Sequence, residues 1–174
     1  MDTHVGMYFF VPDNWEKYHK IEDGRKIVRN SNSCWFTNLE VKKHNEELVL
    51  YKKYSPSEYP KYDNYDAVEV TTYKDIPMDY SGLMGVPITF LDKYNPEQFE
   101  IVGITKKLGF HLRTKVYPNQ IQVDANGEKS VVSKLNDGAT LKLDKPPKNK
   151  TYYLVDGEYF IQVYARILIK RKEK

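Results

Sequence analysis

Three turn dipeptides separate short strand-like runs in this chain, and they limit the folds that it can adopt. Asp23-Gly24, Asn126-Gly127 and Asp156-Gly157 each lie between two short segments with strand-forming residues. Such pairs accept the positive φ angles of tight turns, because glycine lacks a Cβ and Asn or Asp tolerates left-handed backbone. We therefore predict three β-hairpins. Asn126-Gly127 gives the strongest signal and should join 120–124 to 129–133.

Apolar and alternating runs predict further strands. These runs are 7–11, 34–41, 47–54, 67–72, 85–91, 99–105 and 164–172. The run 67–72 alternates with a period of two, which predicts a half-buried strand. Pro87 lacks a donor N–H, so it should lie at a strand start, an edge or a bulge.

Helical patterns are scarce in comparison. A short helix fits 12–21, and Asn95-Pro96 fits the start of a single helical turn, with Asn as the cap and Pro at the first position. The segment 55–65 holds two prolines and several turn formers, so it predicts an irregular loop. The segment 142–150 reads as a charged, proline-bearing linker. The fold class predicted is therefore α/β leaning towards β.

The charge of the chain is distributed unevenly. The net charge is +3 over 174 residues, but 140–174 hold nine Lys and Arg against four Asp and Glu. Residues 61–100 hold three against eight. A uniformly basic nucleic-acid-binding domain would not show this pattern, so any contact with phosphates should come from limited patches.

No autonomous active site is visible in the sequence. The four histidines, His4, His19, His44 and His111, lack the spacing of a metal site, and we predict neither metal ligands nor catalytic residues. Cys34, the single cysteine, is expected to be a buried apolar residue rather than a nucleophile. One cysteine and the lack of any long apolar run favour a cytoplasmic protein with no membrane contact.

A tyrosine-rich loop at 59–65 (YPKYDNY) is the most suggestive surface candidate. Nucleobases can stack on tyrosine rings, and an asparagine side chain can pair with the edge of an adenine. The alternative is that the loop folds over the domain through its own ring packing. The sequence leaves both interpretations open.

Several long strings of this chain resemble the EcoRI-type adenine-specific DNA methyltransferase family. They are CWFTNL at 34–39, YPKYDNYDAVEV at 59–70 and DIPMDYSGLMGVPITFLDKYNPEQFEI at 75–101. The closing YARILIKRK at 164–172 resembles the terminal strand of that family. The resemblance covers 1–105 and 159–174, whereas 106–158 looks like a divergent hairpin and linker region.

The resemblance implies a methyl transfer from S-adenosylmethionine to the N6 amine of adenine in DNA, on a base flipped from the duplex. In the family, an Asn-Pro-Pro-Phe-type motif and an acidic cofactor segment precede the region matched here, and this sequence contains neither. The implied unit over 1–174 is therefore a single C-terminal domain. It should complete a methyltransferase-like mixed sheet, with 85–91 and 99–105 as paired strands. Alone it should be inactive and bind no cofactor of its own.

The resemblance also implies partners and site residues. Double-stranded DNA should bind weakly to the chain alone, and the N-terminal catalytic part of the same enzyme should be a second partner. Base reading or lining of the pocket for the flipped base is assigned to Tyr62, Asn64 and Tyr65. Contacts with the DNA backbone are assigned to the cations, which are Lys52, Lys53, Lys61, Arg113 and Lys115.

One alternative comes from another class of protein. A β-rich module could bind a protein or peptide through the tyrosine-rich loop or an exposed edge strand. Unpaired edge strands would also promote self-association.

Overall fold

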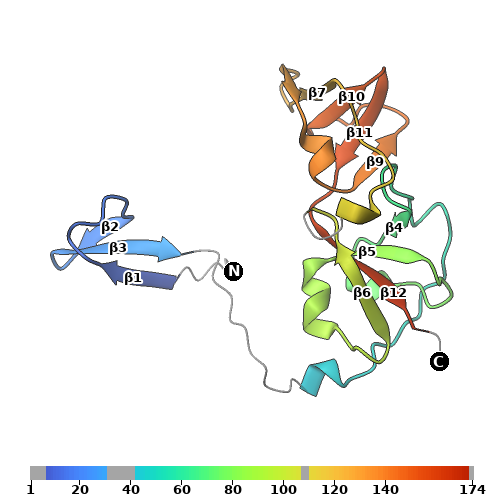
Figure 1. Cartoon of the computed structure of the whole chain (residues 1–174), viewed down its shortest axis with the longest axis horizontal. Coiled ribbons are helices and arrows are strands. Elements are labelled where there is room, and N and C mark those ends of the chain that lie inside the picture. Colours follow the sequence, from blue (N-terminus) through green and yellow to red (C-terminus); the bar gives the residue numbers. More distant parts are fainter. Residues whose placement is uncertain (1–6, 31–41, 107–109, 173–174) are drawn as a thin grey trace. The chain divides into compact units, whose positions relative to one another are not determined.

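A computed structural model describes residues 7–30, 42–106 and 110–172 (Figure 1). The chain divides into two compact units, Met1–Glu40 and Val41–Lys174. The described residues are rich in strands and hold short 3-10 helices, which confirms the predicted α/β class leaning towards β. None of the described helices is long and apolar enough to cross a membrane. The predicted strand at 34–41 lies outside the described residues.

The first unit contains a three-stranded antiparallel sheet in the order β1-β3-β2. Its strands are β1 (Met7–Val11), β2 (Lys20–Glu22) and β3 (Arg25–Asn30). The predicted hairpin at Asp23-Gly24 is confirmed, with φ angles of 49° and 75°.

The short helix predicted for 12–21 is wrong. The ammonium of Lys26 donates hydrogen bonds to the carbonyl oxygens of Asp13 and Trp15, at 2.5 and 3.0 Å. A helix would need those carbonyls for the N–H groups four residues later. The segment therefore makes one turn, closed by Trp15 N–H on the Pro12 carbonyl, and then runs towards β2.

The second unit begins with a four-stranded mixed sheet in the order β4-β5-β12-β6. Its strands are β4 (Ala67–Glu69), β5 (Leu83–Pro87), β6 (Phe99–Ile104) and β12 (Arg166–Arg171). β4 and β5 run parallel, whereas β12 is antiparallel to both β5 and β6. The predicted direct pairing of 85–91 with 99–105 is therefore wrong, because β12 lies between them. The apolar residues at 167–169 of β12 are buried, as a central strand covered on both faces requires.

β5 begins two residues before the predicted strand and ends at Pro87, which is followed by the 3-10 helix η3 (Ile88–Lys93). The predicted turn at Asn95 is confirmed as a single turn. The Asn95 side-chain oxygen accepts the N–H of Glu97 at 2.8 Å, and its carbonyl accepts the N–H groups of Gln98 and Phe99. β6 then starts at Phe99, since no further helical hydrogen bonds follow.

The strand predicted at 47–54 is wrong, because these residues belong to no strand of a sheet. Leu48 N–H donates to the side-chain oxygen of Gln98 at 2.9 Å, and the Gln98 amide returns a bond to the Leu48 carbonyl at 2.7 Å. A side-chain amide thus takes the place of a neighbouring strand. Lys52 makes one isolated parallel bridge, with Pro77.

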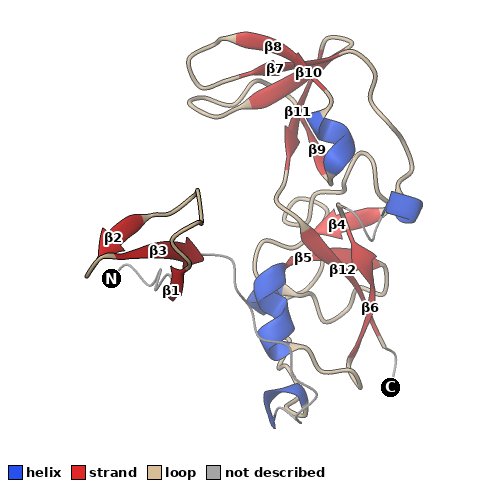
Figure 2. Cartoon of the chain, turned by 60° about the vertical axis from the view of Figure 1, so that its left-hand side comes forward, coloured by secondary structure: helices blue, strands red, loops and turns tan. Residues whose placement is uncertain are grey.

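A five-stranded antiparallel sheet completes the second unit, in the order β8-β7-β10-β11-β9 (Figure 2). Its strands are β7 (Gln120–Val123), β8 (Lys129–Val132), β9 (Thr140–Leu143), β10 (Tyr152–Val155) and β11 (Glu158–Gln162). The hairpins predicted at Asn126-Gly127 and Asp156-Gly157 are both confirmed. The predicted linker 142–150 begins inside β9, because its first two residues pair with β11.

The remaining helical segments are single 3-10 turns. They are η1 (Lys42–His44), η2 (Tyr73–Asp75), η4 (Phe110–Leu112) and η5 (Lys134–Asp137).

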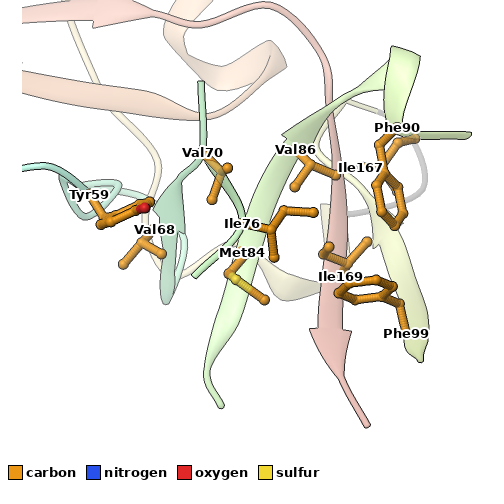
Figure 3. Packing of buried hydrophobic residues seen from close by; sticks show 10 residues of the cluster. All are labelled: Tyr59, Val68, Val70, Ile76, Met84, Val86, Phe90, Phe99, Ile167 and Ile169. Atoms are coloured by element: carbon orange, nitrogen blue, oxygen red, sulfur yellow. The ribbon is translucent and has the colours of Figure 1, made fainter. Parts of the chain in front are cut away.

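The largest apolar cluster lies against the mixed sheet (Figure 3). Side chains from β4, β5 and β12 meet Phe90 of η3 and Phe99 of β6, whose rings are 5.3 Å apart edge to face. Burial of each large side chain contributes about 1.5–3 kcal/mol. Of the strand predicted at 67–72, only 67–69 forms β4, whose three residues are all buried rather than half-buried, whereas Thr71 and Thr72 are exposed. Burial of all three β4 residues places Glu69, a charged residue, inside the unit.

Candidate nucleic-acid interface

The tyrosine-rich loop at 59–65 runs beside β4 and covers that edge of the mixed sheet. Tyr62 N–H donates to the Ala67 carbonyl at 3.0 Å, and Glu69 N–H donates to the Pro60 carbonyl at 2.9 Å. These bonds satisfy backbone groups that an open edge would leave free. The three tyrosine rings of the loop are 2–4% exposed. In the structure the loop therefore follows the second interpretation, in which it folds over the domain by ring packing.

A buried cluster of three polar side chains, the Tyr62–Glu69–Arg166 cluster, fixes the middle of this loop. The Arg166 guanidinium donates to both carboxylate oxygens of Glu69, with Nε at 3.0 and 3.1 Å and Nη2 at 2.5 Å. The Tyr62 hydroxyl donates to the same carboxylate. The Arg166 and Glu69 side chains are 13% and 8% exposed. The cluster thus joins the loop, β4 and the first residue of β12.

Glycine at position 85 makes room for this cluster. A Cβ on Gly85 would collide with the Tyr62 hydroxyl and come within 2.8 Å of a ring carbon. Burial, followed by the charge of Glu69, raises the pKa of Tyr62 well above its ordinary value. Burial lowers the pKa of Arg166, but its hydrogen bonds to Glu69, the negative charge of Glu69 and the nearby Tyr62 together outweigh this effect and raise the pKa overall. Both side chains therefore keep their protons in the folded unit.

Asn64 connects the loop to the five-stranded sheet. Its side-chain amide donates to the Gly138 carbonyl at 2.8 Å, and its side-chain oxygen accepts Thr140 N–H at 2.9 Å. The side chain is fully buried. Backbone groups thus occupy the donor and the acceptor that an adenine edge would use.

Tyr65 is anchored in the same way. Its hydroxyl donates to the Thr105 carbonyl at 2.6 Å, just after β6 ends. The predicted base-reading residues, Tyr62, Asn64 and Tyr65, therefore all lie inside the unit with their polar ends bonded. Direct contact of these side chains with a base stays a prediction, and it would require the loop to leave this position.

The predicted backbone-contacting cations lie nearer the surface, and several of them pair with carboxylates of the same chain. Lys61 lies 2.6 Å from Asp66, and Lys52 lies 3.9 Å from Asp75. Lys115 pairs with Asp63, and its ammonium is also 5.0 Å from the Tyr117 ring centre.

The other two predicted cations differ from these three. Lys53 is exposed, whereas Arg113 is half-buried, with its guanidinium 5.9 Å from the centre of the Tyr65 ring. The ion pairs of Lys52, Lys61 and Lys115 reduce the positive potential that they offer to a phosphate.

Two parts of this interface give no signal in the sequence. Glu69 and Arg166 are 97 residues apart, so no local pattern brings them together. The Tyr117 hydroxyl donates to Asp63 at 2.7 Å, and burial, with the Asp63 hydrogen bond, raises the Tyr117 pKa. Contacts at such separations follow from the topology, and no local pattern predicts them.

A separate pocket of about 730 Å³ lies between residues 47–50 and the end of β12. Its lining combines apolar side chains with two cations and one acid. The residues are Glu47, Leu48, Val49, Leu50, Met78, Gln98, Arg171 and Lys172. Among the residues that the structure describes, no group of His, Cys, Asp or Glu is arranged to hold a metal ion.

Comparison with known proteins places this chain in a family. The model of the family described as adenine-specific methyltransferase EcoRI matches residues 2–172. The chain belongs to the EcoRI adenine-specific methyltransferase family. The matched range includes 106–158, the region that looked divergent in the sequence.

Three members of this methyltransferase family show the extent of the similarity. The Type II methyltransferase M.EcoRI of Escherichia coli is 50% identical over 104 residues, which cover 56% of this chain and 32% of that protein. M.MgeORF184P of Mycoplasma genitalium is 40% identical and M.MpnI of Mycoplasma pneumoniae 38% identical, each over 104 residues, which cover 55% of this chain and 33% of each relative. The matched part thus spans about a third of the length of these relatives. No solved structure matches the chain.

The cofactor of a methyltransferase can be tested against the pocket. S-adenosylmethionine carries a positive sulfonium and an adenine ring. The cations Arg171 and Lys172 in the lining would repel the sulfonium, and the lining offers no aromatic ring to the adenine. The lining of this pocket therefore does not fit the cofactor.

Proposed function

We propose that this chain is the C-terminal part of an S-adenosylmethionine-dependent adenine-N6 DNA methyltransferase of the restriction–modification type. In that role it completes the mixed sheet of the enzyme and contributes to recognition of the DNA target. The N-terminal part of the same enzyme supplies the cofactor site and the group that holds the adenine amine.

One observation carries this proposal. The family match extends over nearly the whole chain, yet the aligned part spans about a third of each relative. The described residues also support this role. The mixed sheet and the five-stranded sheet are held by apolar packing and by buried hydrogen bonds, as a part of the enzyme that completes the fold would be. A cytoplasmic location stays a prediction, supported by the single cysteine.

The DNA-contacting surface is proposed in two parts. The exposed or half-buried cations Lys52, Lys53, Lys61, Arg113 and Lys115 contact the sugar–phosphate backbone. The buried residues of the tyrosine-rich loop, Tyr62, Asn64 and Tyr65, keep these cations in position by joining the two sheets. Because three of the cations already pair with carboxylates, affinity for duplex DNA should be weak and should fall as salt rises.

Methyl transfer tests the proposal directly. The purified chain is mixed with duplex DNA and labelled S-adenosylmethionine, alone and together with the N-terminal two-thirds of a relative such as M.EcoRI. Transfer should require both polypeptides. Transfer by this chain alone would contradict the proposed division, and no transfer by the mixture, with both parts folded, would count against the sheet-completing role.

The peptide-binding alternative depends on a different surface. The rings of the tyrosine-rich loop are buried, so the loop offers a peptide little aromatic surface. β6 lies at an edge of the mixed sheet and stays available for strand addition or self-association. Size-exclusion chromatography with and without duplex DNA separates the two functions, because a dimer that is indifferent to DNA favours the module.

A further inference from the structure

The connection between β9 and β10 carries a cationic segment that forms no ion pair with the described residues of the unit. Residues 145–150 (KPPKNK) contain three lysines and neither Asp nor Glu. Lys145, Lys148 and Lys150 are all exposed, and within the described part of the chain none of them lies in an ion pair. Three of the cations assigned to DNA from the sequence are paired instead. Lys145, Lys148 and Lys150 therefore form a group of three unpaired, exposed cations beside the five-stranded sheet. The other run of three cations without an ion pair among the described residues, Lys170, Arg171 and Lys172, lies at the end of the mixed sheet.

The topology holds this segment along the sheet. β9 and β10 are both antiparallel to β11, so they run parallel to each other. A connection between parallel strands must return from one end of the sheet to the other. Leu143 pairs with Tyr159 near the β10–β11 turn, whereas Tyr152, at the far end of β10, pairs with Val123. Both ends of the segment are thus fixed by strands of the five-stranded sheet.

The backbone of the segment is also restricted. Pro146 and Pro147 fix their φ angles near −65°, and the side chain of Pro147 is half-buried. Asn149 has a φ of 55°, which marks a left-handed turn between Lys148 and Lys150. A restrained segment loses less conformational entropy when it binds a ligand than a free loop does.

The spacing suits a polyanion. Five residues span at most about 17 Å when extended, so the three ammonium groups can follow one strand of a duplex. One strand presents a phosphate about every 3.4 Å along the helix axis, so several phosphates fall within this reach. Lysine acts as a point charge towards phosphate and needs no fixed geometry.

We propose that the β9–β10 connection grips the backbone of duplex DNA through Lys145, Lys148 and Lys150. This inference rests on the proposed function, and it places the main phosphate contact on the five-stranded sheet rather than on the tyrosine-rich loop. The contact carries no sequence information, and it sets the position of the duplex on the unit.

A matched pair of double variants tests the proposal. K145Q/K148Q removes two charges from the connection, and K129Q/K134Q removes two exposed lysines of the same sheet that lie in or beside β8. Binding of a labelled duplex is measured from low to moderate salt. The slope of log K against log salt should fall by about 1.8 in the first variant, because each phosphate contact contributes about 0.9. At 0.1 M salt this corresponds to about 60-fold weaker binding, and the second variant should bind like the unchanged chain.

Equal losses in the two variants would overturn the proposal, since they would reflect net charge alone. Binding that neither variant alters would also overturn it, while the DNA-binding function would stand. If the unchanged chain binds no duplex at low salt, the proposed function fails and this inference falls with it. Acetylation of lysines with and without duplex, read by mass spectrometry, gives a test without substitutions. Lys145, Lys148 and Lys150 should be protected, and protection of Lys129 and Lys134 instead would contradict the proposal.

Discussion

Substitution of Glu69 by Gln should destabilise the second unit more than the loss of any surface ion pair. The change removes the charge opposite Arg166 and retains the shape of the side chain. Because the Glu69 and Arg166 side chains are only 8% and 13% exposed, the guanidinium would remain buried without its counter-charge. Breaking one partner of a buried pair costs about 3–5 kcal/mol. For a unit of this size, that corresponds to a fall in Tm of roughly 10–20 °C.

The assay is urea unfolding followed by far-ultraviolet circular dichroism, with K61Q as the matched control. Lys61 and Asp66 form an ion pair whose side chains are 67% and 78% exposed, so its loss should change the unfolding midpoint little. The double change E69Q/R166M should recover part of the lost stability, since it removes the unpaired charge as well. A loss for E69Q no larger than that for K61Q would refute the reasoning that the Tyr62–Glu69–Arg166 cluster holds the loop to the sheet.

Three further predictions concern the same region. Gly85→Ala should destabilise the unit by about 1–3 kcal/mol in urea unfolding, because the new methyl group collides with Tyr62, and a neutral result would contradict that close approach. Asn64→Ala should lower the free energy of unfolding by about 2–4 kcal/mol, because Thr140 N–H and the Gly138 carbonyl lose their partner. Proteolysis should then cut first between the two sheets. An unchanged cleavage pattern would argue against this link. The folded unit holds the pKa of Tyr62 and Tyr117 above the ordinary 10.0 of the unfolded chain. Below pH 10 both tyrosines are therefore protonated in the folded and in the unfolded chain, and stability is retained. Above pH 10 the unfolded chain loses these protons first, so stability should fall as pH rises, with late tyrosine ionisation visible by ultraviolet absorbance; ionisation of all tyrosines together at pH 10 in the folded protein would be inconsistent with this.

The sequence by itself determined the local turns and the family. Asp23-Gly24 and Asp156-Gly157 form the predicted hairpins because both residues of each pair adopt positive φ, which depends on the residues themselves. The single turn at Asn95 is also a local feature, because the Asn95 side chain accepts a hydrogen bond from Glu97 N–H, only two residues later. The strings at 59–70 and 75–101 resembled the family to which the chain belongs, and this information also needs no tertiary contact.

Only the tertiary structure decided which residues meet. β12 enters between β5 and β6 although more than 60 residues separate it from both, so the pattern of 85–91 and 99–105 could not exclude a direct pairing. For Tyr62 and Asn64 the sequence leaves open an exposed or a buried position, and the structure turns them inwards because Glu69, Gly138 and Thr140 offer them partners. Burial of a polar group is stable only when distant parts of the chain satisfy its hydrogen bonds, and that condition is set by the folded topology.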